Sequence, residues 1–328
     1  MQFDKTACER IRRRLAGGEG IEAIATSLRC PSSSIRRALK RLGFPTVADC
    51  ASGAPDLGPT LYEVFAPSDT VTDPVVPPPP AQSGLRTTLV ISDVHRPYHD
   101  PQAWLVALEV ARELRPYRVV IIGDWQDCYS VSKFTKDPDR LRFLRNELED
   151  GRAGLRELET AAQAECYDFC EGNHEVRIPA LINSKVPALH GMISIREYLG
   201  LDAHGWRWAP YKTSVRVGKM TYTHDVGRYG MYAARWTLAD VGTNVTFGHT
   251  HKLCSWFEGN LHEGVHTCLN VGWLGDLDKV DYKHQDKARR EFQHGLGVVY
   301  QDQDGVSYAH PVPIINGRCE VAGRMISA

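Results

Sequence analysis

Short apolar runs alternate with polar stretches between residues 87 and 271, and five of these runs end on residue types that bind metal ions. The run ends read Asp93-Val94-His95, Gly123-Asp124-Trp125-Gln126-Asp127, Gly172-Asn173-His174-Glu175, Thr223-His224 and Gly248-His249-Thr250-His251. In an open α/β fold, the carboxyl ends of the strands gather at one edge of the sheet, where ligands bind. The pattern therefore predicts an α/β domain that collects carboxylates, an amide and imidazoles at one edge.

The same alternation predicts where the strands of this domain lie. We expect strands at 87–92, 118–122, 167–170, 219–223, 244–247 and 267–271. A closing hairpin should follow and end near Ile315, because its Asp304-Gly305 pair is typical of a tight turn.

Two helical stretches lie among these strands. The first should run from Pro101 to Arg115, since proline suits the first turn of a helix and His99 or Asp100 can cap it. The second spans 139–164, where apolar residues recur at three- and four-residue steps, namely Leu141, Leu144, Leu148, Leu155, Leu158 and Ala162. Gly151 and Gly154 weaken its middle, so this stretch is one helix, or two, packed on a sheet.

The residue types at the strand ends suit a pair of transition-metal ions. Imidazole favours zinc, iron and manganese, whereas carboxylate and amide oxygens favour harder cations. In the DxH and HxH motifs, ligands two residues apart on an extended chain would point to the same face. The glycines at 123, 172 and 248 would let the backbone turn sharply. A single motif of this kind is weak, because a lone buried histidine is usually a core residue, but five in this order are specific.

In this order, the motifs DxH, GDxxD, GNHE, H and GHTH resemble the calcineurin-like metallophosphoesterases over about residues 87–275. The resemblance implies a four-layer α/β/β/α sandwich that holds two metals between its sheets. It implies that Asp93, His95, Asp124 and His251 bind the first metal, and that Asp124, Asn173, His224 and His249 bind the second. It also implies that His174, which is not a ligand in this family, protonates the leaving oxygen and is oriented by Asp127.

The chemistry expected of such a centre is hydrolysis of a phosphate monoester or diester. Two divalent cations would clamp the phosphoryl oxygens and lower the pKa of a bound water, so that hydroxide attacks. We expect Mn²⁺, with Fe, Zn, Ni or Mg as alternatives. The sequence departs from the phosphoprotein phosphatases of this family, because Cys128 follows Asp127 and Glu171 precedes the GNHE motif. This departure favours the nucleases, nucleotidases and diesterases.

Five residues next to these motifs have two interpretations each. Asp225 either accepts the second N–H of a metal-bound histidine or is a surface carboxylate. Trp125 and Trp273 could stack on a nucleobase, although core packing is favoured. Arg177 and Lys252 could meet a phosphate, although solvated charges are the simpler expectation.

The first 44 residues differ in character from the rest of the chain. Residues 1–42 carry a net charge of +6, whereas the whole chain carries −1. The segment IEAIATSLRCPSSSIRRALKRLGF is similar to a helix-turn-helix, with a short helix, a tight turn and a basic helix. The residues predicted to face DNA are Ser33, Ser34, Arg36, Arg37, Lys40 and Arg41. The alternative is a small helical module for protein contacts with a solvated basic face.

The domain organisation follows from composition. We predict an all-α basic domain at 1–44, a linker at 45–84 that holds nine of the nineteen prolines, and a catalytic domain at 85–328. The nine cysteines form no CxxC pair, the N-terminus lacks an apolar signal segment, and no run is long enough to cross a membrane. We therefore expect a cytoplasmic protein with reduced thiols and no membrane partner, while its oligomeric state stays open.

Together these features favour a metal-dependent phosphoesterase that acts on DNA, with the basic head holding the substrate near the catalytic domain. One alternative is a nucleotidase or cyclic-nucleotide diesterase whose head serves oligomerisation. Another is a DNA-binding regulator with an inactive enzyme domain, which the complete ligand set disfavours.

Overall fold

The computed structural model describes residues 11, 21–28, 35, 70–73, 84–262, 264–279 and 291–328. The chain divides into two compact units, Met1–Gly58 and Pro59–Ala328. Within the described part of the first unit, helix α2 spans Ile21–Ser27, and Ile11, Ile24 and Ile35 are buried. The predicted DNA-facing residues of the head lie outside the described residues, namely Ser33, Ser34, Arg36, Arg37, Lys40 and Arg41. The helix-turn-helix therefore stays a prediction.

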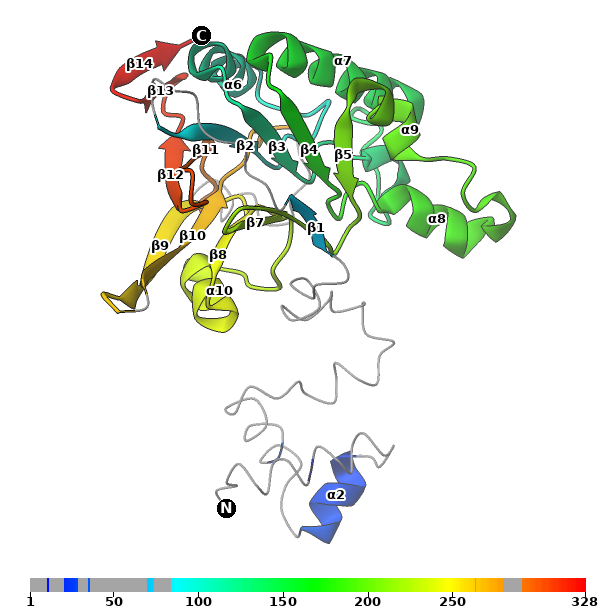
Figure 1. The fold of residues 1–328 in the computed structure, drawn as a ribbon. Coiled ribbons are helices and arrows are strands. Elements are labelled where there is room, and N and C mark those ends of the chain that lie inside the picture. The colour runs from blue at the N-terminus through cyan, green and yellow to red at the C-terminus, as the bar shows by residue number, and fades with distance from the viewer. Residues whose placement is uncertain are drawn as a thin grey trace. The chain divides into compact units, whose positions relative to one another are not determined.

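The second unit contains two six-stranded sheets (Figure 1). Sheet I has the strand order β12-β11-β2-β3-β4-β5, in which β2 to β5 run parallel and β11 and β12 are antiparallel. Its strands are β2 (Arg86–Ile91), β3 (Arg118–Ile122), β4 (Cys166–Cys170), β5 (Trp206–Ala209), β11 (Gly295–Gln301) and β12 (Ser307–Pro313).

Sheet II has the order β1-β6-β7-β8-β10-β9, with β7, β8 and β10 parallel. Its strands are β1 (Thr70–Asp73), β6 (Ser214–Val217), β7 (Met220–Thr223), β8 (Asn244–Phe247), β9 (Leu253–Asn260) and β10 (Gly264–Val271). A separate hairpin joins β13 (Arg318–Val321) to β14 (Arg324–Ser327).

Helices cover the outer faces of both sheets (Figure 1). The α-helices of this unit are α6 (Pro101–Leu114), α7 (Leu144–Ala162), α8 (Arg177–Lys185), α9 (Ile195–Leu199) and α10 (Ala233–Val241). Short 3₁₀ turns are η1 (Tyr129–Val131), η2 (Pro187–Leu189) and η3 (Asp202–His204). Helices α6 and α7 pack on sheet I, and α10 packs on sheet II.

The alternation of side chains along the strands produces the layers. In β3, Val119 and Ile121 face the helices, whereas Val120 and Ile122 belong to the core between the two sheets. Successive side chains of a strand point to opposite faces, so one buried strand serves both cores. The fold is thus an α/β/β/α sandwich, as the family resemblance implied.

Most predicted elements are confirmed, with small shifts at their ends. The β11–β12 hairpin turns at Asp304-Gly305, and Asp100 caps α6 by accepting a hydrogen bond from Ala103 N–H at 2.7 Å. The second helical stretch is one helix, α7, which starts later than predicted and leaves Leu141 half-exposed outside it. Strands β5, β6, β9, β13 and β14 were not predicted, because they are short or half-exposed and carry a weak apolar pattern.

The predicted linker at 45–84 needs a correction. Within it, Thr70–Asp73 forms β1 and pairs in parallel with β6 at the edge of sheet II. The sequence Thr-Val-Thr is rich in β-branched residues, which favour strands even beside a proline-rich stretch. The second unit therefore begins before residue 85.

No helix in the described part of the chain combines the length and the apolar character needed to cross a membrane. Six cysteines are described as free thiols, and four of them are buried.

Candidate metal centre

The five predicted strand ends meet at one place in the sandwich. Asp93 N–H donates to the Gly123 carbonyl at 3.1 Å, which joins the loops after β2 and β3. Gly248 N–H donates to the His224 carbonyl at 3.1 Å, which joins the loops after β7 and β8. His249 N–H then donates to Oδ2 of Asp93 at 2.8 Å, so the loops of the two sheets form a single site.

The backbone at this site is not extended, contrary to the prediction for the DxH and HxH motifs. Asp93, His95, Asp124, His249 and His251 all have positive φ angles, between 49° and 67°. After β2, β3 and β8 the chain turns through the left-handed region, so the side chains there point toward one another instead of along a strand face. Such a conformation costs about 1–3 kcal/mol per residue and persists where the surroundings enforce it.

The first group of inward-facing atoms comes from Asp93, His95 and His251. Oδ2 of Asp93 accepts hydrogen bonds from the Ser92 hydroxyl and from His249 N–H. Its other oxygen, Oδ1, faces Nε2 of His251 at 3.2 Å and Nε2 of His95 at 3.9 Å. The two Nε2 atoms lie 3.2 Å apart. One carboxylate oxygen and two imidazole nitrogens therefore converge on one point.

The second group comes from Asp124, Asn173, His224 and His249. Nδ1 of His224 donates to the Ile122 carbonyl at 2.8 Å, which leaves Nε2 directed inward. Nε2 of His224 lies 3.3 Å from Oδ2 of Asp124, 3.0 Å from Oδ1 of Asn173 and 3.2 Å from Nδ1 of His249. Four atoms of types that bind metal ions thus lie close together.

This donor set fits divalent cations. Each group mixes carboxylate or amide oxygen with imidazole nitrogen, the combination that manganese, iron and zinc accept. The outer atoms of the ligands are held by hydrogen bonds to the protein, as partners of metal-bound residues usually are. The structure thus brings together all seven residues predicted as ligands, and their binding of metal stays a prediction.

The electrostatics of the site favour added positive charge. Burial opposes the ionisation of Asp93 and Asp124, yet the neighbouring histidines hold the pKa of both carboxyls below their usual value. For Asp124 these neighbours include both His224 and His95, so its carboxylate interacts with residues of both groups. Burial also acts against protonation of His224, but Asp124 raises its pKa to about 10.

The predicted acid, His174, lies beside these groups and is held by Asp127 and Arg177. Its Nδ1 donates to the Asp127 backbone carbonyl at 3.0 Å, and its Nε2 accepts from Nη2 of Arg177 at 2.8 Å. The Asp127 carboxylate lies closer to Nδ1 of His95, at 3.2 Å, than to Nδ1 of His174, at 3.6 Å. The structure therefore places the Asp127 side chain behind His95 and the Asp127 backbone behind His174.

Burial, together with Arg177, lowers the pKa of His174 to about 3, against the opposing charge of Asp124. His174 is neutral in this arrangement. Its Nε2 is occupied by the hydrogen bond from Arg177 and carries no proton in this arrangement.

Glu175, the last residue of the GNHE motif, was not assigned a role from sequence. It is fully buried, and its carboxylate accepts hydrogen bonds from the backbone N–H groups of Gly172 at 2.8 Å, Asp124 at 3.1 Å and Gln126 at 2.8 Å. Burial, with the nearby Asp124 carboxylate, raises the pKa of Glu175 to about 7. This side chain ties the loop after β4 to the loop after β3.

Gly248 is required for close approach rather than for a turn. A Cβ atom at this position would lie 1.9 Å from Oγ of Ser92 and 2.6 Å from Oδ2 of Asp93. Both atoms belong to the contact that holds Asp93, so a side chain here would displace a predicted ligand.

Four residues next to the motifs had two interpretations each, and the structure shows what surrounds them. Trp125 and Trp273 are buried, and Trp273 stacks on the ring of His251 at 4.9 Å, so both serve in packing. Lys252 pairs with Glu291. Asp225 lies 3.9 Å from Nε2 of His249.

Comparisons with known proteins add the following. No protein-family model matches the chain. Two phage proteins, each named Gene 54 protein, from Mycobacterium phage D29 and Mycobacterium phage L5, are both 28% identical to it, over 72% of this chain and 97% of theirs.

Two solved structures are among those similar to the chain. Vps29 from Entamoeba histolytica, complexed with zinc, is 14% identical with a TM-score of 0.35, over 71% of this chain and 96% of that one. YfcE, a phosphoesterase from E. coli, is 16% identical with a TM-score of 0.34, over 70% and 100%. Identities and TM-scores this low assign no function, so a functional assignment rests on the residues of the site itself.

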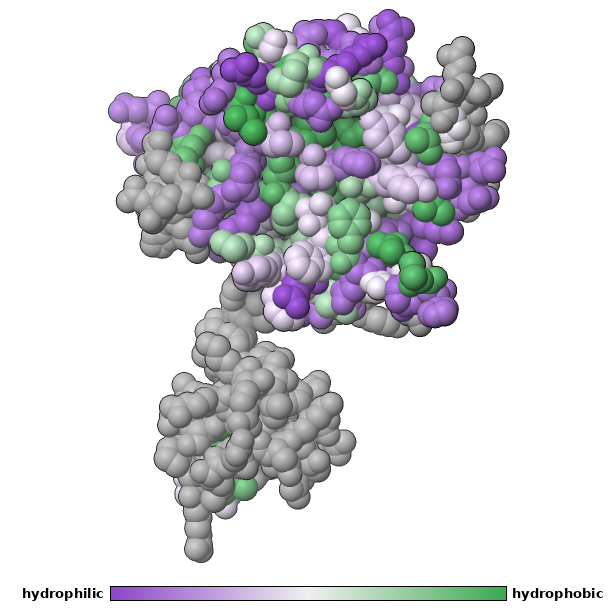
Figure 2. All heavy atoms as spheres, turned by 90° about the vertical axis from the view of Figure 1, so that its left-hand side faces the viewer, coloured by the Kyte–Doolittle hydropathy of each residue, from purple (hydrophilic) through white to green (hydrophobic). Residues whose placement is uncertain are grey.

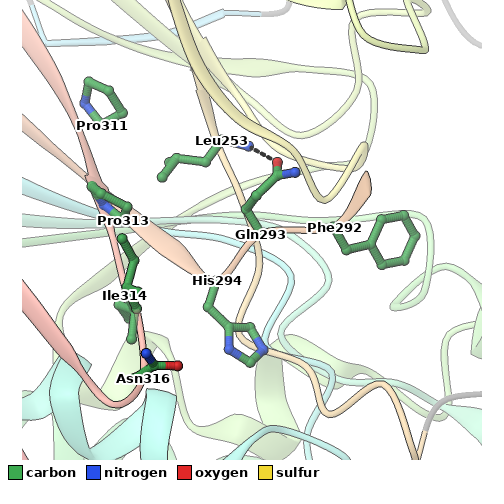
Figure 3. Close-up of a pocket in the computed structure, with 9 residues that line it drawn as sticks. Leu253, Phe292, Gln293, His294, Pro311, Pro313, Ile314 and Asn316 are labelled. Carbon is green, nitrogen blue, oxygen red and sulfur yellow. Dashed lines mark hydrogen bonds between the residues drawn. The ribbon is translucent and has the colours of Figure 1, made fainter. Parts of the chain in front are cut away.

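A separate pocket of about 590 Å³ lies beside β12. In Figure 3, Pro311, Pro313 and Ile314 form one wall, and Leu253 and Gln293 stand opposite. On the face of the second unit seen in Figure 2, apolar side chains run as a broken band between hydrophilic ones. The pocket is mostly apolar and contains none of the seven predicted ligands, so it is not the metal centre.

Proposed function

We propose that this chain is a phosphoesterase that uses two divalent cations to hydrolyse phosphate esters. The observation that carries the proposal is the convergence of seven oxygen and nitrogen donors, from five strand ends of two sheets, on one buried site. When bound, such a metal pair would polarise the phosphoryl group and lower the pKa of a water molecule.

In this proposal the ligands divide as the resemblance implied. The first cation is held by Asp93, His95, Asp124 and His251, and the second by Asp124, Asn173, His224 and His249. Asp124 is shared, which is supported by its interactions with histidines of both groups. Mn²⁺ is the preferred ion, because the set combines hard oxygens with imidazoles.

The remaining residues would position the substrate and its proton. Arg177 presents a guanidinium at the site, the group best suited to a phosphate oxygen. When Arg177 turns to the phosphate, Nε2 of His174 is free to take up a proton from water and pass it to the leaving oxygen, while Nδ1 keeps its hydrogen bond to the Asp127 carbonyl.

We further propose that the substrate is DNA. The support is the net charge of +6 in residues 1–42, together with their similarity to a helix-turn-helix. The alternative is a nucleotidase or cyclic-nucleotide diesterase whose head joins copies of the chain.

The test begins with the full chain purified and loaded with Mn²⁺. Mass spectrometry should find two metal ions per chain, and bis-p-nitrophenyl phosphate should be hydrolysed. Asp124→Asn should lose both ions and activity, whereas the exposed Asp202→Asn should keep both. A wild-type chain with neither stoichiometric metal nor hydrolysis would refute the proposal.

A substrate panel tests the DNA assignment. It contains nucleotides, cyclic nucleotides, a phosphopeptide, and single- and double-stranded DNA. In the full chain, Arg36→Ala with Arg37→Ala should slow cleavage of DNA but not of bis-p-nitrophenyl phosphate. If this double variant cleaves DNA as fast as the wild type does, the nucleotidase alternative is favoured.

A further inference from the structure

The loop that follows the predicted ligand His224 exposes large side chains to solvent. It connects β7 to α10, and Tyr229 is 63% exposed, Met231 71% and Tyr232 57%. Large apolar side chains exposed together in one loop often mark a binding surface. The position of the loop directly beside the metal centre indicates what it could bind.

Tyr229 packs against a predicted metal ligand. The centre of its ring lies 5.5 Å from that of His249, at an interplanar angle of 62°. His249 in turn directs Nδ1 toward His224. Tyr229 therefore contacts one member of the second group, His249, and is one side chain removed from His224, while most of its own surface stays open.

The loop holds Tyr229 in place before any substrate arrives. The tyrosine hydroxyl donates to Oδ2 of Asp225 at 3.4 Å, and Oδ1 of the same residue accepts from Gly227 N–H at 2.7 Å. Arg228 pairs with Asp240 of α10. A ring fixed in this way loses little conformational entropy when a ligand stacks on it.

We propose that Tyr229 is a stacking platform for a nucleobase, so that the substrate of this site is a phosphoester that carries one. The proposal rests on the proposed phosphoesterase function. Every base has a π-face, and stacking on an exposed aromatic ring is the common way to hold one without reading its sequence. In a nucleotide, one sugar joins the base to the phosphate. In the same way, one side chain, His249, contacts both Tyr229 and the predicted ligand His224.

The other aromatic candidates near the site cannot serve this purpose. Trp125 is fully buried and Trp273 is 2% exposed, so neither offers a free ring face. Among the aromatic side chains described in contact with the predicted ligands, Tyr229 is the largely exposed one.

The experiment compares thymidine 5′-monophosphate with 2-deoxyribose 5-phosphate, which has the same phosphate and sugar but no base. Each competes with hydrolysis of bis-p-nitrophenyl phosphate by the Mn²⁺-loaded full chain, and the ratio of the two inhibition constants is measured within each variant. The wild type should prefer the nucleotide by about 5- to 150-fold, the range that one base–aromatic stack supplies. Tyr229→Leu should lose most of this preference, and Tyr229→Phe should keep it.

Tyr308→Leu is the matched control. Tyr308 is 50% exposed. It pairs with Tyr300, which pairs with Thr87 at the start of β2. The predicted ligand Asp93 follows the other end of β2, so Tyr308 lies away from the site. This variant should keep the wild-type preference. An oligothymidylate that competes better than the mononucleotide would identify a nucleic-acid strand as the source of the base, and equal competition would identify a free nucleotide.

Two results would overturn the inference while the proposed function stands. In one, the wild type hydrolyses the reporter but binds the nucleotide no better than the sugar phosphate. In the other, Tyr229→Leu retains the full preference. A wild type that does not hydrolyse the reporter at all would instead remove the proposed function.

Discussion

Gly154 of α7 lies directly against the guanidinium of Arg96, the residue that follows the DxH motif. A Cβ atom at position 154 would lie 2.4 Å from Cζ of Arg96. The arginine is 4% exposed, bonds to Asp150 at 2.8 Å and lies over the ring of Trp104. It has little room to move. The glycine that weakens the helix in isolation is thus what lets α7 support the loop of the first two predicted ligands.

The first prediction concerns this contact. Helix propensity alone predicts that Gly154→Ala stabilises the protein by about 1 kcal/mol. The clash with Arg96 should outweigh this gain, since overpacking costs about 1–3 kcal/mol. Urea unfolding should therefore show a less stable variant. Ala153→Gly, at the exposed neighbouring position, measures the effect of helix propensity without a clash. If Gly154→Ala were more stable than the wild type, the side chain of Arg96 would have to move aside at little cost.

The second prediction concerns His174, which contacts Asp127 and Arg177 with its ring nitrogens. His174→Ala should keep both metal ions, yet lose about 10²–10⁴-fold in turnover, the range that general acid catalysis contributes. Metal content by mass spectrometry and kcat on bis-p-nitrophenyl phosphate measure the two effects separately. Loss of metal along with activity would make His174 a ligand.

The third prediction concerns a buried ion cluster in the core between the sheets. Asp168 of β4 is fully buried and pairs with Arg118 of β3 and with Arg207 of β5. Asp168→Ala removes the carboxylate from Arg118, which is 2% exposed, and should cost about 3–5 kcal/mol in unfolding free energy. The exposed pair of Arg196 with Asp202 provides the comparison: Asp202→Ala should cost at most about 1 kcal/mol. Similar losses from the two variants would contradict this account.

The fourth prediction is a pH dependence at Glu147. This side chain of α7 is fully buried and accepts hydrogen bonds from Tyr129 N–H at 3.0 Å and Ser130 N–H at 3.1 Å. Burial raises its pKa above the usual 4.5 despite these bonds. In the window between the unfolded and folded pKa values, the folded chain holds more protons at Glu147 than the unfolded chain. The contribution of Glu147 to stability therefore falls as the pH rises through that window.

Glu147→Gln removes this titration. The unfolding free energy of the variant, measured relative to the wild type, should therefore rise as the pH rises above about 4.5. Glu149→Gln changes an exposed glutamate of the same helix and is the control. A difference between Glu147→Gln and wild type that stays constant from pH 4 to pH 8 would argue against the buried carboxyl as its source.

Much of the fold and the predicted ligand set could be read from local pattern. The strand at 118–122 and the turn at Asp304-Gly305 follow from apolar runs and turn residues, which depend on neighbours in the chain. Asp93 and His249 are residue types that bind metal ions, and both follow apolar runs, so local sequence alone marks them as candidate ligands. The short strand β1 at Thr70–Asp73 escaped the same approach, because its pairing with β6 is a property of the sheet.

The amino-acid sequence by itself therefore determined the apolar runs of the strands and the metal-binding residue types that follow them, because these are local properties. The layers and the set of seven predicted ligands were implied by the resemblance of these motifs to a known family. Only the tertiary structure decided how those donors face one another through left-handed turns, why Gly154 stands against Arg96, and that the exposed ring beside His249 belongs to Tyr229. These are relations between residues far apart in the chain, and the packing of two sheets and their helices creates them.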